Sequence, residues 1–169
     1  MSDSKSRVLI GWREWVALPD LGVPALKAKV DTGARTSALH AVSLEEYRVG
    51  STPWVRFQVQ PRQGTEHALV EAAAPLKEYR HVRSSNGQLE RRPVIITTIS
   101  LLGYHWPAEI TLSNRTTMGF RMLLGREALR GRFGVDPGRS YLGGPEPRTA
   151  HEKHLDTLRK RPRRQHSAE

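Results

Sequence analysis

The chain has 169 residues, enough for one domain with its own core, and carries a formal net charge of +10 at pH 7. It contains no cysteine, which excludes disulfides and cysteine-bound metal. It also lacks the apolar runs of a membrane span or a signal peptide, so we expect a cytoplasmic protein without a membrane partner. The charge favours an acidic partner, such as an acidic peptide, a nucleic acid or a ribosome, but a proteome rich in arginine explains it equally well.

Two strands and a turn are predicted at the start of the chain. Residues 1–7 are polar, and we expect them to be disordered. A first strand is predicted over residues 8–17, and proline and glycine within residues 19–22 indicate a turn. Apolar residues then alternate with lysines up to Asp31, as in a half-buried strand.

The sequence after this strand favours a carboxylate held in a fixed place. Asp31 is followed at once by Thr32 and Gly33. A carboxylate at the end of a buried strand is costly unless it is hydrogen-bonded. Thr32 offers a hydroxyl, and the missing Cβ of Gly33 lets backbone amides approach closely.

The middle of the chain predicts further strands separated by turns. Strands are expected within residues 35–49, 54–60 and 67–73, with turns at residues 50–53 and 61–64.

A long hairpin with a polar tip is predicted next. Asn86 and Gly87 form the strongest short hairpin signal, and residues 94–99 are strongly β-prone. This hairpin either closes over a site as a lid or is an ordinary surface hairpin.

The last part of the chain predicts two strands, a short helix and a tail. Residues 104–112 alternate as an amphipathic strand, in which Pro107 indicates an edge or a bulge. Residues 120–124 read as a buried strand, and residues 126–130 as a helix that Gly131 ends.

After Phe133 the pattern becomes irregular. Residues 149–161 are compatible with a short helix. The basic tail, residues 145–169, is expected to be disordered and solvated, with a nucleic-acid or ribosome contact as the alternative. Together the elements predict a mainly β, closed, barrel-like fold.

Two motifs resemble one family of enzymes. The sequence from Asp31 to Ala34 resembles the active-site motif of aspartic peptidases, and residues 122–127 resemble the segment before the C-terminal helix of retropepsins. Several sequence segments resemble those of the RimK-associated, retropepsin-like family often labelled "ATP-dependent zinc protease". They are DTGARTSALHA, VRSSNG, RRPVI, TLSNRTTM and MLLGREAL. The resemblance covers residues 8–144 and implies one peptidase domain, a retropepsin-like closed β-barrel with one short C-terminal helix.

The resemblance implies a homodimer. Peptide hydrolysis by carboxylates needs two of them, one ionised and one protonated. The chain has one Asp-Thr-Gly, and Asp20, Asp136 and Asp156 lack its context. Each subunit would therefore supply Asp31 as the catalytic residue across a two-fold axis, with no metal or cofactor.

The resemblance also gives roles to other residues. These are Thr32, Gly33 and Ala34 as loop support, Arg35, Ser84, Ser85, Asn86 and Gly87 as substrate-binding residues, and Gly125 and Arg126 as support of the dimer core. In this comparison the predicted hairpin takes the place of the flap that closes over substrate. Arg35 stands where many viral members carry an acid, and a cation there favours acidic substrate side chains.

The family context suggests partners. Its members sit beside RimK-like ATP-grasp ligases, which add glutamates to protein C-termini, so the expected substrate is such an acidic extension, for example on a ribosomal protein. His151 and His154 are one residue too close for a His-Glu-x-x-His zinc motif. The sequence also contains no phosphate-binding Gly-Lys-Ser/Thr loop, so any ATP dependence is expected to belong to a partner. The alternatives are a non-catalytic basic RNA- or ribosome-binding β-module and a zinc-dependent hydrolase.

Overall fold

The computed structural model describes residues 7–62, 69–84, 86–114 and 119–146. Over these residues the elements are β1 (Val8–Gly11), β2 (Arg13–Leu18), η1 (Pro19–Leu21), β3 (Val23–Asp31), β4 (Ser37–His40), β5 (Val42–Val49), β6 (Thr52–Val59), β7 (Val70–Arg83), β8 (Leu89–Leu101), β9 (Tyr104–Ser113), β10 (Met122–Gly125), α1 (Arg126–Leu129) and β11 (Phe133–Asp136). The prediction of a mainly β fold with one short helix is confirmed. None of the described helices has the length and apolar character needed to cross a membrane.

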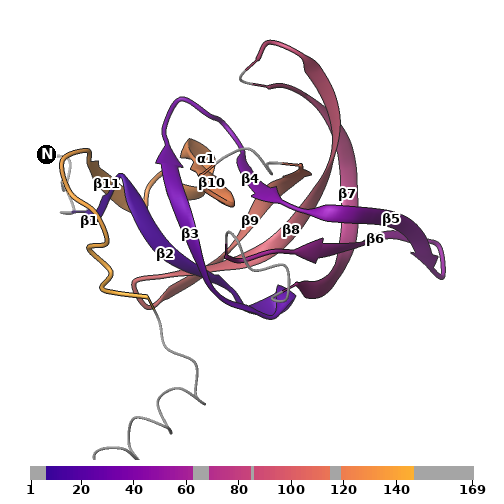
Figure 1. Ribbon diagram of the computed structural model, residues 1–169, viewed down its shortest axis with the longest axis horizontal. Coiled ribbons are helices and arrows are strands. Elements are labelled where there is room, and N and C mark those ends of the chain that lie inside the picture. The colour runs from indigo at the N-terminus through magenta and orange to yellow at the C-terminus, as the bar shows by residue number, and fades with distance from the viewer. Residues whose placement is uncertain (1–6, 63–68, 85, 115–118, 147–169) are drawn as a thin grey trace, which may run out of the picture.

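Most of the strands belong to one sheet that closes on itself (Figure 1). Its order is β2-β3-β10-β4-β9-β8-β7-β6-β5, and a further pairing of Ala17 with Ser100 joins β2 to β8. The strands from β2 to β8 in this order therefore form a ring, from which β7, β6 and β5 extend. Strands β1 and β11 form a separate parallel pair.

The hydrophobic core contains side chains of the ring strands and also of β1, β6 and β11. Successive side chains of a strand point to opposite faces, so each strand can turn one face to the core. In β3, Leu26 and Ala28 are fully buried, whereas Lys27 and Lys29 between them are exposed. The alternation predicted for the strand before Asp31 is thus confirmed. The largest fully buried side chains are Phe57, Ile10, Leu18, Leu26, Leu39, Ile95, Ile99, Leu101, Ile110, Leu112, Met122 and Leu124.

Several turn predictions are confirmed. Residues 19–22 reverse the chain through η1, and Gly22 adopts a φ of +70°. The Asn-Gly hairpin connects β7 to β8, with Gly87 at a φ of +82°. Gly131, at a φ of +75°, follows α1 as expected.

Pro107 lies where β9 has one neighbouring strand. It faces Thr98 of β8, while the pairing of β9 with β4 starts only at Ile110. The missing N–H therefore removes no ladder hydrogen bond to β4, which fits the predicted edge position.

Two strand predictions were wrong in their bounds. The strand predicted over residues 8–17 is interrupted at Trp12, whose N–H donates to the carbonyl of Arg139 at 2.9 Å. The strand predicted over residues 67–73 continues to Arg83. Its pairing with β6 stops at Pro75, and from Leu76 onward β7 pairs with β8 instead. Residues 67–68 themselves lie outside the described residues.

Strand β11 begins at Phe133, where the sequence pattern becomes irregular and predicted no strand. It pairs in parallel with β1 over residues 133–136, although glycine and proline make this stretch read as a loop. The pairing partner lies at the other end of the chain, so no local signal marks it. The helix predicted at 149–161, and most of the segments 1–7 and 145–169, lie outside the described residues.

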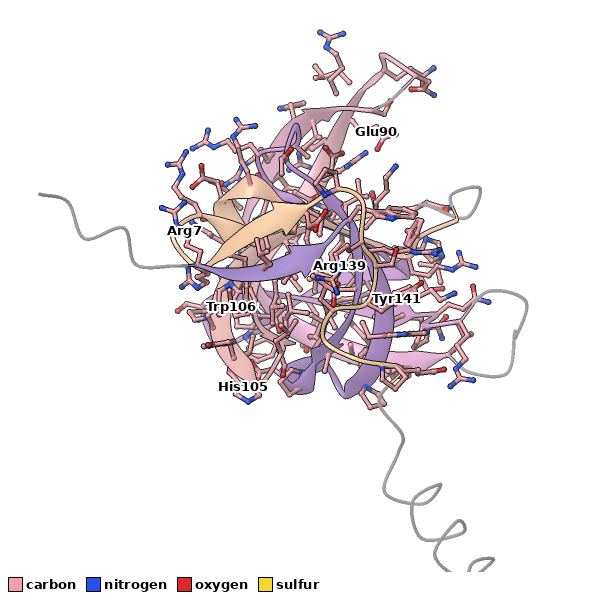
Figure 2. All side chains as sticks on the ribbon, turned by 90° about the vertical axis from the view of Figure 1, so that its left-hand side faces the viewer. Arg7, Glu90, His105, Trp106, Arg139 and Tyr141 are labelled. Atoms are coloured by element: carbon pink, nitrogen blue, oxygen red, sulfur yellow. The ribbon has the colours of Figure 1, made fainter. Side chains whose placement is uncertain are left out.

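The segment after β11 returns across the start of the chain (Figure 2). It carries Arg139 and Tyr141, and the N–H of Tyr141 donates to the carbonyl of Arg13 at 3.0 Å. A Cβ on Gly11 would lie 2.3 Å from the carbonyl oxygen of Arg139, so only glycine permits this approach.

A buried carboxylate fixes the same segment. Glu14 is fully buried, and its two oxygens accept N–H groups of Gly11 (3.0 Å), Leu142 (2.9 Å) and Gly143 (2.8 Å). Three backbone donors compensate the cost of burying the charge. Glu14 therefore ties residues 142–143 to the turn between β1 and β2.

Candidate active site

Asp31 is the last residue of β3, and its carboxylate is held by the loop that follows. Oδ1 accepts the N–H of Gly33 at 3.1 Å and the N–H of Ala34 at 3.2 Å. The N–H of Ala34 also donates to the carbonyl of Asp31 at 3.2 Å. Such bonds from an aspartate to backbone two and three residues ahead fix the loop and the carboxylate together.

Gly125 brings a second segment against this loop. It lies opposite Asp31 in the parallel pairing of β10 with β3. A Cβ on Gly125 would lie 2.6 Å from the carbonyl carbon of Thr36 and 2.9 Å from the carbonyl oxygen of Arg35. Its N–H donates to Oγ of Ser37 at 3.0 Å. The absence of a side chain at Gly125 is what allows the two segments to touch.

The first turn of α1 binds the loop directly. The N–H of Arg126 donates to the carbonyl of Ala34 at 2.8 Å, and the N–H of Glu127 donates to the carbonyl of Arg35 at 3.2 Å. The guanidinium of Arg126 donates from Nη1 to the carbonyl of Gly33 at 3.1 Å. Arg126 therefore connects the helix to the loop within one chain, while its predicted role at a dimer core stays a prediction.

A cleft of about 1060 Å³ opens beside Asp31, between this loop and the hairpin of β7 and β8. Figure 1 shows this hairpin rising from the ring on the side where the loop after β3 lies. The predicted site residues that line the cleft are Asp31, Gly33, Ala34, Arg35, Ser84 and Asn86.

Four of the predicted site residues do not line the cleft. Thr32 is exposed, Gly87 is at the hairpin tip, and Gly125 and Arg126 support the loop from behind. Ser85 lies outside the described residues.

Arg80 connects the base of the hairpin with the loop. Its guanidinium contacts Glu78, lies 3.0 Å from Oε2 of Glu109 and donates from Nη1 to Oγ1 of Thr36 at 3.3 Å. Hydrogen bonds first from Lys77 and then from Arg80 lower the pKa of the Glu109 carboxyl below its usual value. The positive charge of Arg80 is therefore largely balanced by its acidic neighbours.

A second paired arginine lies further along the cleft wall. Nη2 of Arg92 lies 2.8 Å from Oε2 of Glu90, and both residues line the cleft. Among the described residues, Asp31 and Glu90 are the carboxylates that line it. Asp20 instead binds Thr98 through its carboxylate, and Asp136 accepts the N–H two residues ahead of it.

Within the described ranges, no three His, Asp or Glu side chains converge as a metal site. The segment with His151 and His154 lies outside these ranges.

The sequence did not identify most of the charged cleft residues. Those missed are Lys29, Arg80, His81, Arg83, Glu90 and Arg92. For Lys29 a signal was present, because residues two apart on a strand share a face and Lys29 precedes Asp31 by two. The hairpin residues enter the cleft only because the hairpin folds over the loop, which no local pattern reveals.

Comparison with known proteins gives a consistent family. The family model described as RimB-like, retropepsin-like aspartic endopeptidase RimB, matches residues 9–146. A crystal structure of Lpg0085 from Legionella pneumophila, a protein of unknown function (DUF785), is similar with a TM-score of 0.70 and 27% identity. That likeness covers 82% of this chain and 99% of the Legionella chain.

Curated relatives carry a different name. A protein of Shewanella halifaxensis is 45% identical over 146 residues, and one of Parasynechococcus marenigrum is 44% identical over 138 residues. Both are named "Probable alpha-L-glutamate ligase". The matches cover 86% and 82% of this chain but 31% and 30% of those proteins, so the chain spans about a third of their length.

Proposed function

We propose that this chain, which belongs to the RimB-like family of retropepsin-like aspartic endopeptidases, hydrolyses peptide bonds with two copies of Asp31, one from each subunit of a homodimer. The observation that carries the proposal is the position of Asp31. Its carboxylate is fixed by two backbone N–H groups at the wall of a cleft large enough for a peptide.

The proposed dimer supplies the second carboxylate that the reaction needs. Glu90, the other carboxylate in the described cleft wall, is bound by Arg92. A second aspartate in the same environment is then supplied most simply by a two-fold axis. Thr32 and Gly33 are exposed in the single subunit, which leaves this face of the loop available to a partner.

The reaction uses the pair of carboxyls in two protonation states. Two carboxyls in close contact share one proton, because both do not ionise cheaply. The ionised Asp31 takes a proton from water, which attacks the peptide carbonyl, while the protonated one donates to the carbonyl oxygen. When the tetrahedral intermediate collapses, the carbon–nitrogen bond breaks and a proton passes to the leaving amine.

An acidic extension is the substrate that the family context favours. Curated relatives are named as probable glutamate ligases, and Arg35 adds positive charge to the cleft wall. We propose that the enzyme trims glutamate chains added by a RimK-like ligase, for example to a ribosomal protein. The hairpin of β7 and β8, with Ser84 and Asn86 facing the cleft, would act as the flap over such a peptide.

Replacing Asp31 with asparagine tests the proposal. Asp31→Asn removes the acid–base group but keeps an oxygen for the loop N–H groups, so we expect a folded protein, an unchanged dimer in sedimentation, and loss of cleavage of a glutamate-tailed peptide by at least about a thousandfold. Asp20→Asn is the matched control, because Asp20 binds Thr98 away from the cleft. Cleavage retained in Asp31→Asn, or a wild-type protein that stays monomeric while active, would contradict the proposal.

A further inference from the structure

Accepting the proposed peptidase function, we infer that Lys29 selects an acidic substrate side chain beside the scissile bond. Lys29 lies two residues before Asp31 on β3, and both line the cleft. Side chains two apart on a strand share a face, and a rise of about 3.3 Å per residue puts the two Cα atoms about 7 Å apart. An extended peptide in the cleft has the same spacing between alternate side chains. Lys29 can therefore reach a carboxylate next to the bond that Asp31 attacks.

Within the described part of the chain, Lys29 has no acidic partner, in contrast to two arginines of the cleft wall, Arg80 and Arg92. Arg80 is engaged by Glu109, and Arg92 by Glu90. Among the residues that the structure describes, Lys29 makes no ion pair or hydrogen bond through its side chain. An arginine already paired offers little net charge to a ligand, whereas an unpaired ammonium offers its full charge.

The cation opposite Lys29 on the neighbouring strand is engaged elsewhere. Arg13 of β2 pairs with Lys29 in the antiparallel ladder, but its Nε donates to Oγ of Ser140 at 3.2 Å and its guanidinium lies over the rings of Trp12 and Tyr141. Arg13 does not line the cleft, so on β3 it is Lys29 that offers a cation to a bound carboxylate.

The same strand provides a control residue. Lys27 shares the exposed face of β3 but lies outside the cleft, with its ammonium 5.5 Å from the ring centroid of Trp15. Loss of its charge changes the overall charge of the protein as much as loss of Lys29 does. A difference between the two variants therefore reports position and not net charge.

Symmetry extends the inference to the substrate. In the proposed homodimer a second Lys29 lies across the two-fold axis, so a cation stands on each side of the scissile bond. The substrate class is then a peptide with acidic residues on both sides of the bond. Such an enzyme cleaves inside an acidic run faster than at its junction with neutral sequence.

The test measures binding and cleavage separately. In the Asp31→Asn background, a fluorescein-labelled peptide with six glutamates and its six-glutamine counterpart are titrated by anisotropy at low salt. Lys29→Gln is expected to weaken glutamate-peptide binding about three- to tenfold and to leave glutamine-peptide binding unchanged. Lys29→Arg and Lys27→Gln are expected to keep the preference. With Asp31 intact, Lys29→Gln is expected to raise KM for the glutamate peptide with little change in kcat.

The outcomes separate this inference from the proposed function. If Lys29→Gln keeps the full preference for glutamate, selection by Lys29 is refuted even when the wild-type protein cleaves the peptide. If the preference depends on Lys29 but nothing is cleaved, the peptidase proposal fails and the binding site remains. Peptides with glutamate on one side and glutamine on the other test the symmetric form, which is wrong if they are cleaved as fast as the all-glutamate peptide.

Discussion

Replacing Gly125 with alanine tests whether close backbone contact holds the loop after Asp31 in place. The new Cβ would lie 2.6 Å and 2.8 Å from the carbonyl carbon and oxygen of Thr36, and 2.9 Å from the carbonyl oxygen of Arg35. All three atoms belong to the backbone, so no change of side-chain rotamer relieves the overlap. Strand β10 and the segment after Asp31 must separate instead.

The cost can be worked out from these contacts. Overpacking of a close contact typically costs about 1–3 kcal/mol. Gly125→Ala should lie at the upper end of this range, because the overlapping atoms of Thr36 and Arg35 belong to the backbone. Separation also lengthens the 3.0 Å bond from the N–H of Gly125 to Oγ of Ser37, a buried bond worth about 1 kcal/mol. With a total of about 3–4 kcal/mol, Tm should fall by roughly 6–16 °C for a chain of this size.

Thermal unfolding followed by circular dichroism measures this loss, and peptide cleavage well below Tm measures the effect on the loop. Gly138→Ala is the control, because its Cβ would make only an ordinary 3.5 Å contact with Oδ1 of Asp136, and we expect a change within about 0.5 kcal/mol. A Gly125→Ala protein with the Tm and cleavage rate of the wild type would refute the reasoning.

Two further substitutions test the buried carboxylate of Glu14 and the carboxylate of Glu109, which pairs with Arg80. Glu14→Gln leaves at least one of three backbone N–H donors without an acceptor, so urea unfolding should show a loss of about 2–4 kcal/mol; an unchanged midpoint would show that Glu14 does not hold the C-terminal segment. Glu109 has a pKa depressed by Lys77 and Arg80, so its contribution is present above the unfolded-state pKa near 4.5 and is lost as pH falls through the lower folded-state pKa. Glu109→Gln should therefore lose less stability on acidification than the wild type, and parallel Tm–pH curves would disprove this.

Local patterns predicted the parts of the fold that local interactions determine. Alternation of apolar residues with Lys27 and Lys29 defined β3 up to Asp31, and Asn86 with Gly87 marked the hairpin. The helix after Gly125 began and ended near the expected residues. In each case the signal and the structure lie within a few residues of each other.

The features that the sequence did not predict depend on contacts between residues far apart in the chain. Strand β11 exists because Val8 at the start of the chain pairs with Phe133 near its end. Glu14 lies on the buried face of β2 together with Val16 and Leu18. An acidic residue at a position that alternates with these apolar residues was a signal that its carboxylate has a buried hydrogen-bonding partner. The identity of the partner, three N–H groups of which two lie some 130 residues further on, required the fold.

The site divides into a part built from backbone and a part built from side chains. Asp31 is held by N–H groups of the loop, and the loop is held by N–H groups of Arg126 and Glu127, bonds that any non-proline residue can make. The charges along the cleft, in contrast, come from side chains on β3 and on the hairpin, such as Lys29 and Arg80. Because the two parts depend on different atoms, substitutions at Lys29 can change the preferred peptide while the geometry around Asp31 is retained.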